Sequence, residues 1–322
     1  MVDNFKTLFR LYRLYAKMDL LWFLRDTRYC LLQLFSDTVC ACCTVAGVFL
    51  LSANFDGFGG MNQDEILFMM GFSILVDGLY MVFFIGNNAA MISRTIGRGQ
   101  LDHVLIQPVP VWTELLAQGF SPLSGSSMLV WGFLLTIYAG RKLMITVTPL
   151  WLLLFFVYAV SSVLLIVSFM YLLSCAAFYA PAAAEEIAQV GKDLFTSLKM
   201  YPLGGIAPAA RRIFLTVLPV GLASWFPARI LLKVSAAAAG TGIAAGTGAA
   251  TGTGVAAGTG VATGMGAAAG THVGSLLLPF GEILLLPAVT LLFLTITLIV
   301  FKKGMKYYAV YGSPRYSGFG HR

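Results

Sequence analysis

Long runs of apolar residues alternate along the chain with short polar segments. A helix that crosses a bilayer needs about 20 mostly apolar residues, and each run approaches or exceeds this length. The pattern therefore predicts an all-α membrane protein with six transmembrane helices. The predicted spans are residues 29–53, 66–88, 115–139, 150–174, 213–233 and 284–301.

The segment before the first span is amphipathic. Within residues 4–20, aromatic and aliphatic side chains recur at helical spacing, and four cations occupy another face. We interpret residues 1–28 as an N-terminal helix at the cytoplasmic interface, with its basic face toward anionic lipid. The alternative is a helix that packs against another part of a protein.

The charge distribution predicts the orientation. Only 11% of the 322 residues are charged, against roughly 25% in soluble domains. Basic residues in short loops stay on the cytoplasmic side, and most of the 21 Lys and Arg residues fall in segments that this rule places inside, including Lys199, Arg211 and Arg212. Both chain ends are therefore expected in the cytoplasm and the protein in the cell membrane. Topology and anionic lipid account for the net charge of +7, so no nucleic acid is expected as a partner.

Two features lie near the last span. Residues 235–274 are almost wholly Ala, Gly and Thr, and we interpret them as a flexible, low-complexity outer loop rather than a membrane helix. The following stretch holds Pro279, Glu282 and Pro287 in apolar surroundings, which fits a short re-entrant helix.

Residues 89–114 are unusually polar and are predicted as an ordered cytoplasmic loop. Leu101, Val104 and Leu105 recur at helical spacing. Glycines before them supply a turn, and Pro108 and Pro110 end the short helix. A short amphipathic helix just inside the membrane is typical of a coupling helix.

Three stretches resemble a known family. The sequence GQLDHVLIQP at 99–108 resembles the G-x-L-D-x-x-L-x-x-P signature of ABC-2-type transporter permeases. The region from Tyr201-Pro202 through Pro219 and Pro227 looks like the family's fifth span, and FKKGMKYYAVYGS at 301–313 looks like its C-terminal tail.

The resemblance implies that residues 1–322 form a single transmembrane permease domain of an ABC exporter. Cytoplasmic helices of such a subunit dock on a separate ABC ATPase, and a second permease copy or a paralogue completes a dimer. The chain has no G-x-x-x-x-G-K-[ST] motif, so it is not expected to be an enzyme or to bind a cofactor. ATP and Mg²⁺ are used by the partner ATPase.

The resemblance also assigns candidate contacts with the ATPase. Arg98 and Asp102 are the charged candidates, although a solvated loop face gives the same pattern. The full set is Arg98, Gly99, Leu101, Asp102, Leu105 and Pro108. Residues 183–200 are either a second cytoplasmic contact or an exposed helix.

Three carboxylates inside predicted apolar segments are candidates for a transport path, namely Asp37, Asp77 and Glu282. A structural role for each is an equal alternative, and an ion-coupled secondary transporter is the rival function. The isolated histidines argue against an intramembrane enzyme, and the cysteines lie in apolar runs without the spacing of a metal site. The residues do not specify the transported substrate.

Overall fold

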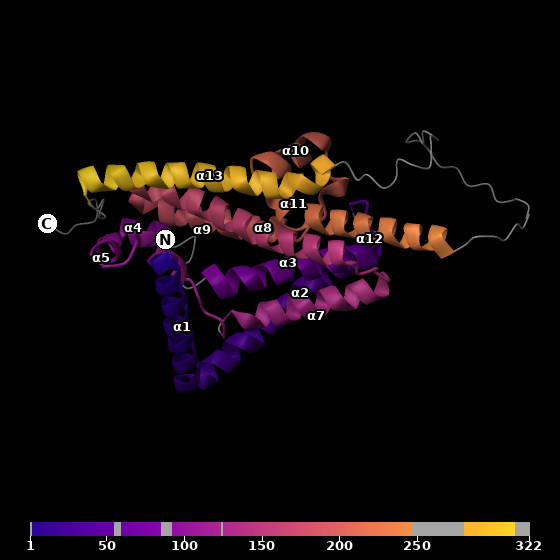
Figure 1. Cartoon of the computed structure of the whole chain (residues 1–322), viewed down its shortest axis with the longest axis horizontal. Helices are drawn as coiled ribbons and strands as arrows, with labels where there is room; N and C mark the ends of the chain where they lie inside the picture. The colour runs from indigo at the N-terminus through magenta and orange to yellow at the C-terminus, as the bar shows by residue number, and fades with distance from the viewer. Residues whose placement is uncertain (1, 55–58, 85–91, 124, 247–279, 313–322) are drawn as a thin grey trace, which may run out of the picture.

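The computed structural model describes residues 2–54, 59–84, 92–123, 125–246 and 280–312 (Figure 1). All regular secondary structure in these ranges is helical. The all-α prediction is therefore confirmed for the part of the chain that the structure describes.

Most of the long helices follow the long axis of the molecule (Figure 1). They are α2 (Thr27–Asn54), α3 (Gln63–Phe84), α7 (Ser126–Lys142), α8 (Pro149–Ser174) and α13 (Phe280–Tyr311). Among the described residues, four stretches are long and apolar enough to cross a membrane: Thr27–Leu50, Gln63–Phe84, Pro149–Phe178 and Gly281–Tyr311. They correspond to four of the six predicted spans.

The third predicted span, 115–139, does not form one helix. Its first part lies in the short α6 (Val111–Ala117), and α7 begins only at Ser126. The 17 residues of α7 rise about 26 Å, which is slightly less than the roughly 30 Å hydrocarbon core of a bilayer.

Glycines bring α7 into close antiparallel contact with α3. A Cβ atom on Gly71 would lie 2.7 Å from the backbone nitrogen of Thr136, and one on Gly78 would overlap the backbone of Leu129. Gly132 of α7 packs in the same way against Leu75. Small residues allow such backbone approach, which supplies the packing that holds helices together in a membrane.

Helices α8 and α13 run side by side in the same direction. The hydroxyl of Thr290 donates to the carbonyl of Ser161 at 3.2 Å, and Thr297 donates to Ser168 at 2.8 Å. The spacing of seven residues is the same on both helices, so the pair keeps its register over two helical turns.

The predicted fifth span, 213–233, is wrong as a single helix. The chain forms α9 (Pro181–Leu198), α10 (Pro208–Thr216), α11 (Val220–Ala223) and α12 (Trp225–Gly246), with 3₁₀ turns at Cys175–Phe178 and Leu203–Gly205. Pro219 lacks an amide hydrogen and has a non-helical backbone conformation as the residue that precedes α11, so the helix is interrupted there.

The boundaries around the low-complexity segment also need correction. Helix α12 continues to Gly246, because its alanines favour helix strongly enough to extend it past residue 235. Residues 247–279 lie outside the described residues. Glu282 and Pro287 belong to α13 itself, so the structure has no separate re-entrant helix at these two positions.

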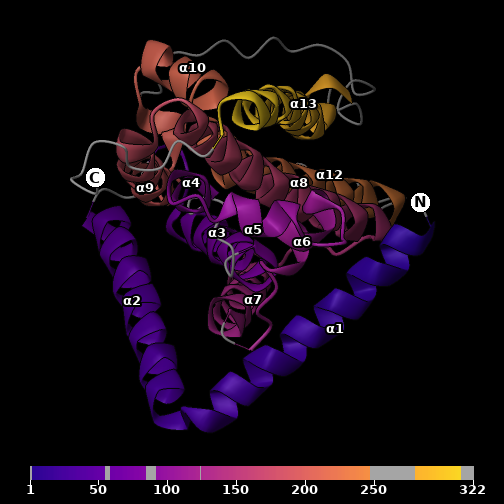
Figure 2. The same cartoon turned by 90° about the vertical axis from the view of Figure 1, so that its left-hand side faces the viewer.

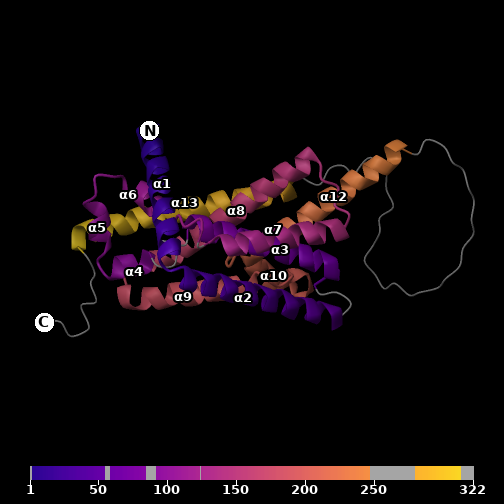
Figure 3. The same cartoon turned by 90° about the horizontal axis from the view of Figure 1, so that it is seen from below.

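Two of the cations that the charge count places inside lie away from the 89–114 loop. Lys199 pairs with Asp77 in the middle of α3, and Arg211 borders a cavity together with Gly59 and Glu65. Gly59 and Glu65 mark the end of α3 that is remote from the 89–114 loop. The amphipathic α9 follows the bundle axis (Figure 3) and carries the chain away from this loop.

Helix α1 (Val2–Arg25) confirms the helical part of the N-terminal prediction. It lies across the long axis of the bundle, and the single residue Asp26 separates it from α2, so that the two helices form a V (Figures 1 and 2). Aromatic contact with the bundle comes from Tyr12, whose ring centre lies 4.8 Å from that of Phe120.

Candidate functional site

The described part of the 89–114 loop gathers at one end of the molecule, near α1 and the end of α13 (Figures 1 and 2). It contains α4 (Ile92–Gly97), α5 (Leu101–Leu105) and the start of α6. The short helix predicted at 101–105 is therefore present, with a second one before it.

Gly99 sets the turn between α4 and α5. Its φ is +69°, its amide donates to the carbonyl of Ile96, and the amide of Gln100 donates to Thr95. These two hydrogen bonds form a Schellman motif, in which the left-handed position strongly favours glycine. Gly99 therefore shapes the loop, as the sequence predicted for a turn.

Two side chains anchor α5 to the bundle. Leu101 and Val104 are buried in a small apolar cluster with Phe178, Phe301 and Tyr308. Leu101 was a candidate for ATPase contact, but the structure gives its side chain an internal packing role.

The two charged candidates also have partners within the chain. A guanidinium nitrogen of Arg98 lies 3.6 Å from a carboxylate oxygen of Glu185 on α9, and Arg94 contacts the same oxygen at the same distance. Asp102 accepts a 2.7 Å hydrogen bond from the Tyr308 hydroxyl on α13. Both residues therefore link the loop to the longer helices.

An apolar tip remains exposed. Ile106 is 79% exposed and Leu105 is 42% exposed, and Pro108 and Trp112 are also on the surface. Leu105 and Pro108 were predicted as contact residues, whereas Ile106 was missed. The sequence signal that could have identified Ile106 is its position directly after the periodic residues of α5.

Helix α1 is fastened to the same end by contacts that sequence reasoning missed. The Tyr15 hydroxyl donates to Glu114 of α6 at 2.8 Å, and Gln118 donates to the same carboxylate oxygen at 2.6 Å. Asp19 accepts a 2.7 Å hydrogen bond from the amide of Leu123. The carboxylate of Glu114 is buried, so its two donors offset the cost of removing it from water.

Burial and the contact with Glu114 shift the pKa of Tyr15. Burial raises the pKa of Tyr15 to about 12, and the hydrogen bond to Glu114 and its negative charge add to the effect. The protonated tyrosine is favoured in the folded state, so its contribution holds below the ordinary tyrosine pKa of roughly 10 and is lost only as pH rises toward the folded-state value. The link between α1 and α6 thus stays intact through neutral pH.

A second candidate site lies along the bundle. Asp77 of α3 forms an ion pair with Lys199, whose side chain comes from the end of α9, and the carbonyl of Lys199 accepts from Ser224. Lys199 is only 1% exposed, so the lysine of this ion pair is almost completely shielded from solvent.

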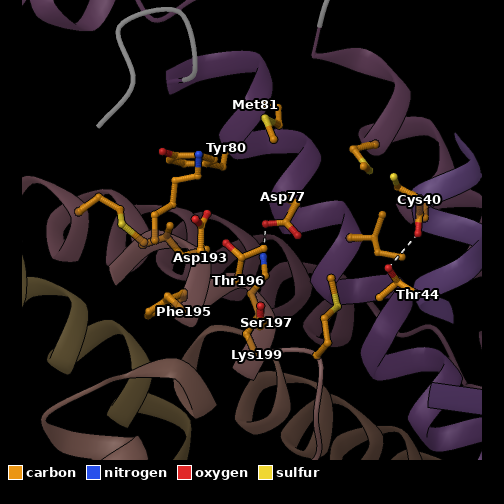
Figure 4. A pocket seen from close by; sticks show the side chains of 17 residues that line it. Cys40, Thr44, Asp77, Tyr80, Met81, Asp193, Phe195, Thr196, Ser197 and Lys199 are labelled. Carbon is orange, nitrogen blue, oxygen red and sulfur yellow. Dashed lines mark hydrogen bonds and ion pairs between the residues drawn. The ribbon is translucent and has the colours of Figure 1, made fainter. Parts of the chain in front are cut away.

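A cavity of about 410 Å³ adjoins this ion pair (Figure 4). Most of its lining is apolar and includes several methionines. Hydroxyl groups of Thr44, Thr196 and Ser197 and the carboxylate of Asp193 add polar positions. The cavity therefore suits a molecule with a large apolar part and a few hydrogen-bonding groups.

The other two candidate carboxylates are held elsewhere. Asp37 accepts hydrogen bonds from Gln33 at 2.9 Å and Ser127 at 3.2 Å. Glu282 lies 3.1 Å from the ammonium of Lys233 on α12. Asp37, Asp77 and Glu282 thus have different partners on different helices, and only Asp77 lines the cavity.

No group of three or more His, Cys, Asp or Glu residues capable of holding a metal occurs in the described ranges. The three cysteines Cys40, Cys42 and Cys43 are free and exposed on α2.

Long apolar helices that expose hydrophobic side chains around a buried ion pair define a helical integral membrane protein. A family model described as ABC-2 family transporter protein matches residues 39–250, about two thirds of the chain, and the protein belongs to this family. It is accordingly a membrane component of a transport system. No curated protein and no solved structure matches the chain.

Proposed function

We propose that this protein is the membrane-spanning permease subunit of an ATP-driven ABC exporter. A separate ABC ATPase hydrolyses ATP with Mg²⁺, and this chain converts the motion of that ATPase into movement of a substrate. The observation that carries the proposal is the ordered loop at 92–114, whose apolar tip is exposed while its base is tied to three helices.

The ATPase docks on the exposed tip. Leu105 and Ile106 offer apolar surface, and Pro108 stiffens the chain that follows. An apolar patch held on a rigid base suits a groove on a partner protein, because little side-chain or backbone freedom is lost on binding.

Motion reaches the bundle through the contacts at the base of the loop. Glu185 connects the loop to α9, and the other end of α9 carries Lys199 against Asp77 at the cavity. Tyr308 connects the loop to α13, and α1 follows through its contact with α6. A displacement of the loop is therefore transmitted to the helices that line the cavity.

The cargo is amphipathic and passes along the cavity beside Asp77 and Lys199. A second permease copy or a paralogue encloses the path. Helix α2 supports this arrangement, because its apolar residues Leu31, Leu32 and Phe35 are exposed and only a small share of the helix is buried within the chain. Lipid covers the remaining apolar surface.

The protein sits in the cell membrane with the loop end in the cytoplasm. Arg94 and Arg98 lie at this end, and α1 crosses it with the orientation of an interfacial helix (Figure 1). The positive-inside rule therefore favours cytoplasmic chain ends. Helices α2, α3, α8, α12 and α13 contribute side chains to one large apolar core, which supports a single permease domain.

Co-purification tests the proposal. The chain is co-expressed with the ATP-binding cassette ATPases of its own genome, beginning with neighbouring genes, and isolated in mild detergent. Ile106→Glu should abolish retention of the ATPase and its stimulated ATP turnover, because a charge replaces the exposed apolar contact. Met144→Glu is the matched control. Met144 is 86% exposed and follows the end of α7 that is remote from the loop at 92–114. Equal retention with both variants would refute docking at this tip.

A further inference from the structure

A second cavity, of about 400 Å³, lies at the end of the bundle remote from the loop at 92–114. The turn at Gly59-Gly60, the start of α3, α10 and α12 contribute to it. Its lining is the more polar of the two cavities considered, and three of its side chains are cations: Arg211, Arg229 and Lys233.

The charges in this cavity are unevenly compensated. Lys233 pairs with Glu282 at 3.1 Å, and Glu65, which also lines the cavity, accepts a 2.9 Å hydrogen bond from the amide of Asn62. Within the described part of the chain, Arg211 and Arg229 have no carboxylate at ion-pairing distance. The guanidinium of Arg229 instead lies 5.4 Å from the ring centre of Trp225.

Trp225 positions one of the two guanidiniums. Its side chain is 4% exposed and borders the cavity, and its ring lies beneath the guanidinium of Arg229. A cation over an aromatic face is attracted to the ring. Trp225 therefore holds the guanidinium of Arg229 beside the cavity.

The backbone at the cavity edge leaves room for close approach. Gly60 has a φ of +73°, and no atom lies within 4 Å of the position that a Cβ would occupy. A side chain at this position would be strained and would narrow the access.

We propose that this cavity binds an oxyanion such as phosphate, which is carried either by a lipid head group or by a solute. Arg211 and Arg229 supply charge-assisted hydrogen bonds to its oxygens, and the ring of Trp225 holds the Arg229 guanidinium in place. Arginine suits this task, because its planar group presents several donors in the geometry of an oxyanion.

Binding to the full-length protein tests the assignment without any ATPase. Wild-type protein is placed in nanodiscs of phosphatidylcholine with or without phosphatidylglycerol, and retained lipid is measured by native mass spectrometry. A parallel calorimetric titration in neutral detergent uses inorganic phosphate. Lipid retention alone identifies a head-group site, and phosphate binding alone or in addition identifies a site open to solutes.

Three variants and one control decide the outcome. Arg211→Gln and Arg229→Gln should each weaken binding about tenfold, which corresponds to the loss of one strong hydrogen bond. Trp225→Leu should weaken binding less, because it removes only the ring beneath Arg229. Arg212→Gln is the control, because Arg212 is the exposed neighbour on α10 and does not line the cavity. Absence of binding by both probes, or an equal loss in the control, would overturn the site. The permease proposal would stand in that case, since this assay contains no ATPase.

Discussion

Gly99 shows how one residue determines the conformation of the loop at 92–114. Its left-handed backbone allows the two hydrogen bonds that end α4, and the next residues enter α5 directly. The direction of the exposed tip at 105–108 therefore depends on a conformation that other residues adopt at a cost.

Gly99→Ala should destabilise the protein by about 1–2 kcal/mol, the cost of a left-handed conformation for an L-residue. Thermal unfolding in detergent measures the loss. Gly47→Ala serves as control, because Gly47 lies in the exposed part of α2 with open space around it and should become no less stable. An unchanged melting temperature for Gly99→Ala would contradict the conclusion that this turn requires glycine.

In the proposed mechanism, the helices transmit the movement of the loop through a few long-range contacts. Glu185 is the point where α9 meets both Arg94 and Arg98, although its half-exposed position limits each ion pair to about 1 kcal/mol or less. This contact therefore matters more for the position of α9 than for the stability of the fold.

Glu185→Arg should leave the ATPase bound but reduce coupled transport about fivefold, which is the equivalent of roughly 1 kcal/mol. Transport into inverted vesicles relative to ATP turnover measures the coupling. The double exchange with Arg98→Glu should restore part of the loss, whereas Glu186→Arg, at the adjacent position, should have little effect. If the double exchange performs no better than Glu185→Arg alone, α9 is not driven through this contact.

The pair α3 and α7 provides a second test of the helix packing. Gly78→Ala inserts a methyl group where the backbone of Leu129 already lies, so the two helices must separate. We expect a loss of about 1–3 kcal/mol or more, typical of overpacking, in a denaturation assay in detergent. Gly140→Ala is the matched change on α7, because only the flexible end of Ile145 lies near it, at 3.7 Å. Equal stability of the two variants would refute the close approach.

At the scale of the whole molecule, apolar length and amphipathic spacing predicted a large part of the architecture. Four spans, the N-terminal helix and the short helix at 101–105 follow from local periodicity. The prediction of a fifth span was wrong because the hydrophobicity of 213–233 concealed the helix breaks around Pro219. The predicted start of the low-complexity loop was wrong because alanines continue α12 to Gly246.

The candidate sites were less predictable, since their partners are distant in sequence. Nothing local to Asp77 indicates Lys199, which is 122 residues away, and nothing near Asp102 indicates Tyr308. The exposed tip was only partly foreseen, because periodicity identifies which residues share a helix face and does not tell which face the bundle covers. Tertiary packing decides that Leu101 is buried and Ile106 is exposed.

The molecule as a whole has a loop end, which we assign to contact with the ATPase, and a remote end, whose cavity we propose as an oxyanion site. Site-specific photo-crosslinking tests the first assignment most directly. A photoreactive amino acid at position 106 should crosslink to the ATPase in native membranes, and the same group at position 144 should not. Crosslinks to the ATPase from position 144, or their absence at 106 while the complex is intact, would contradict the account.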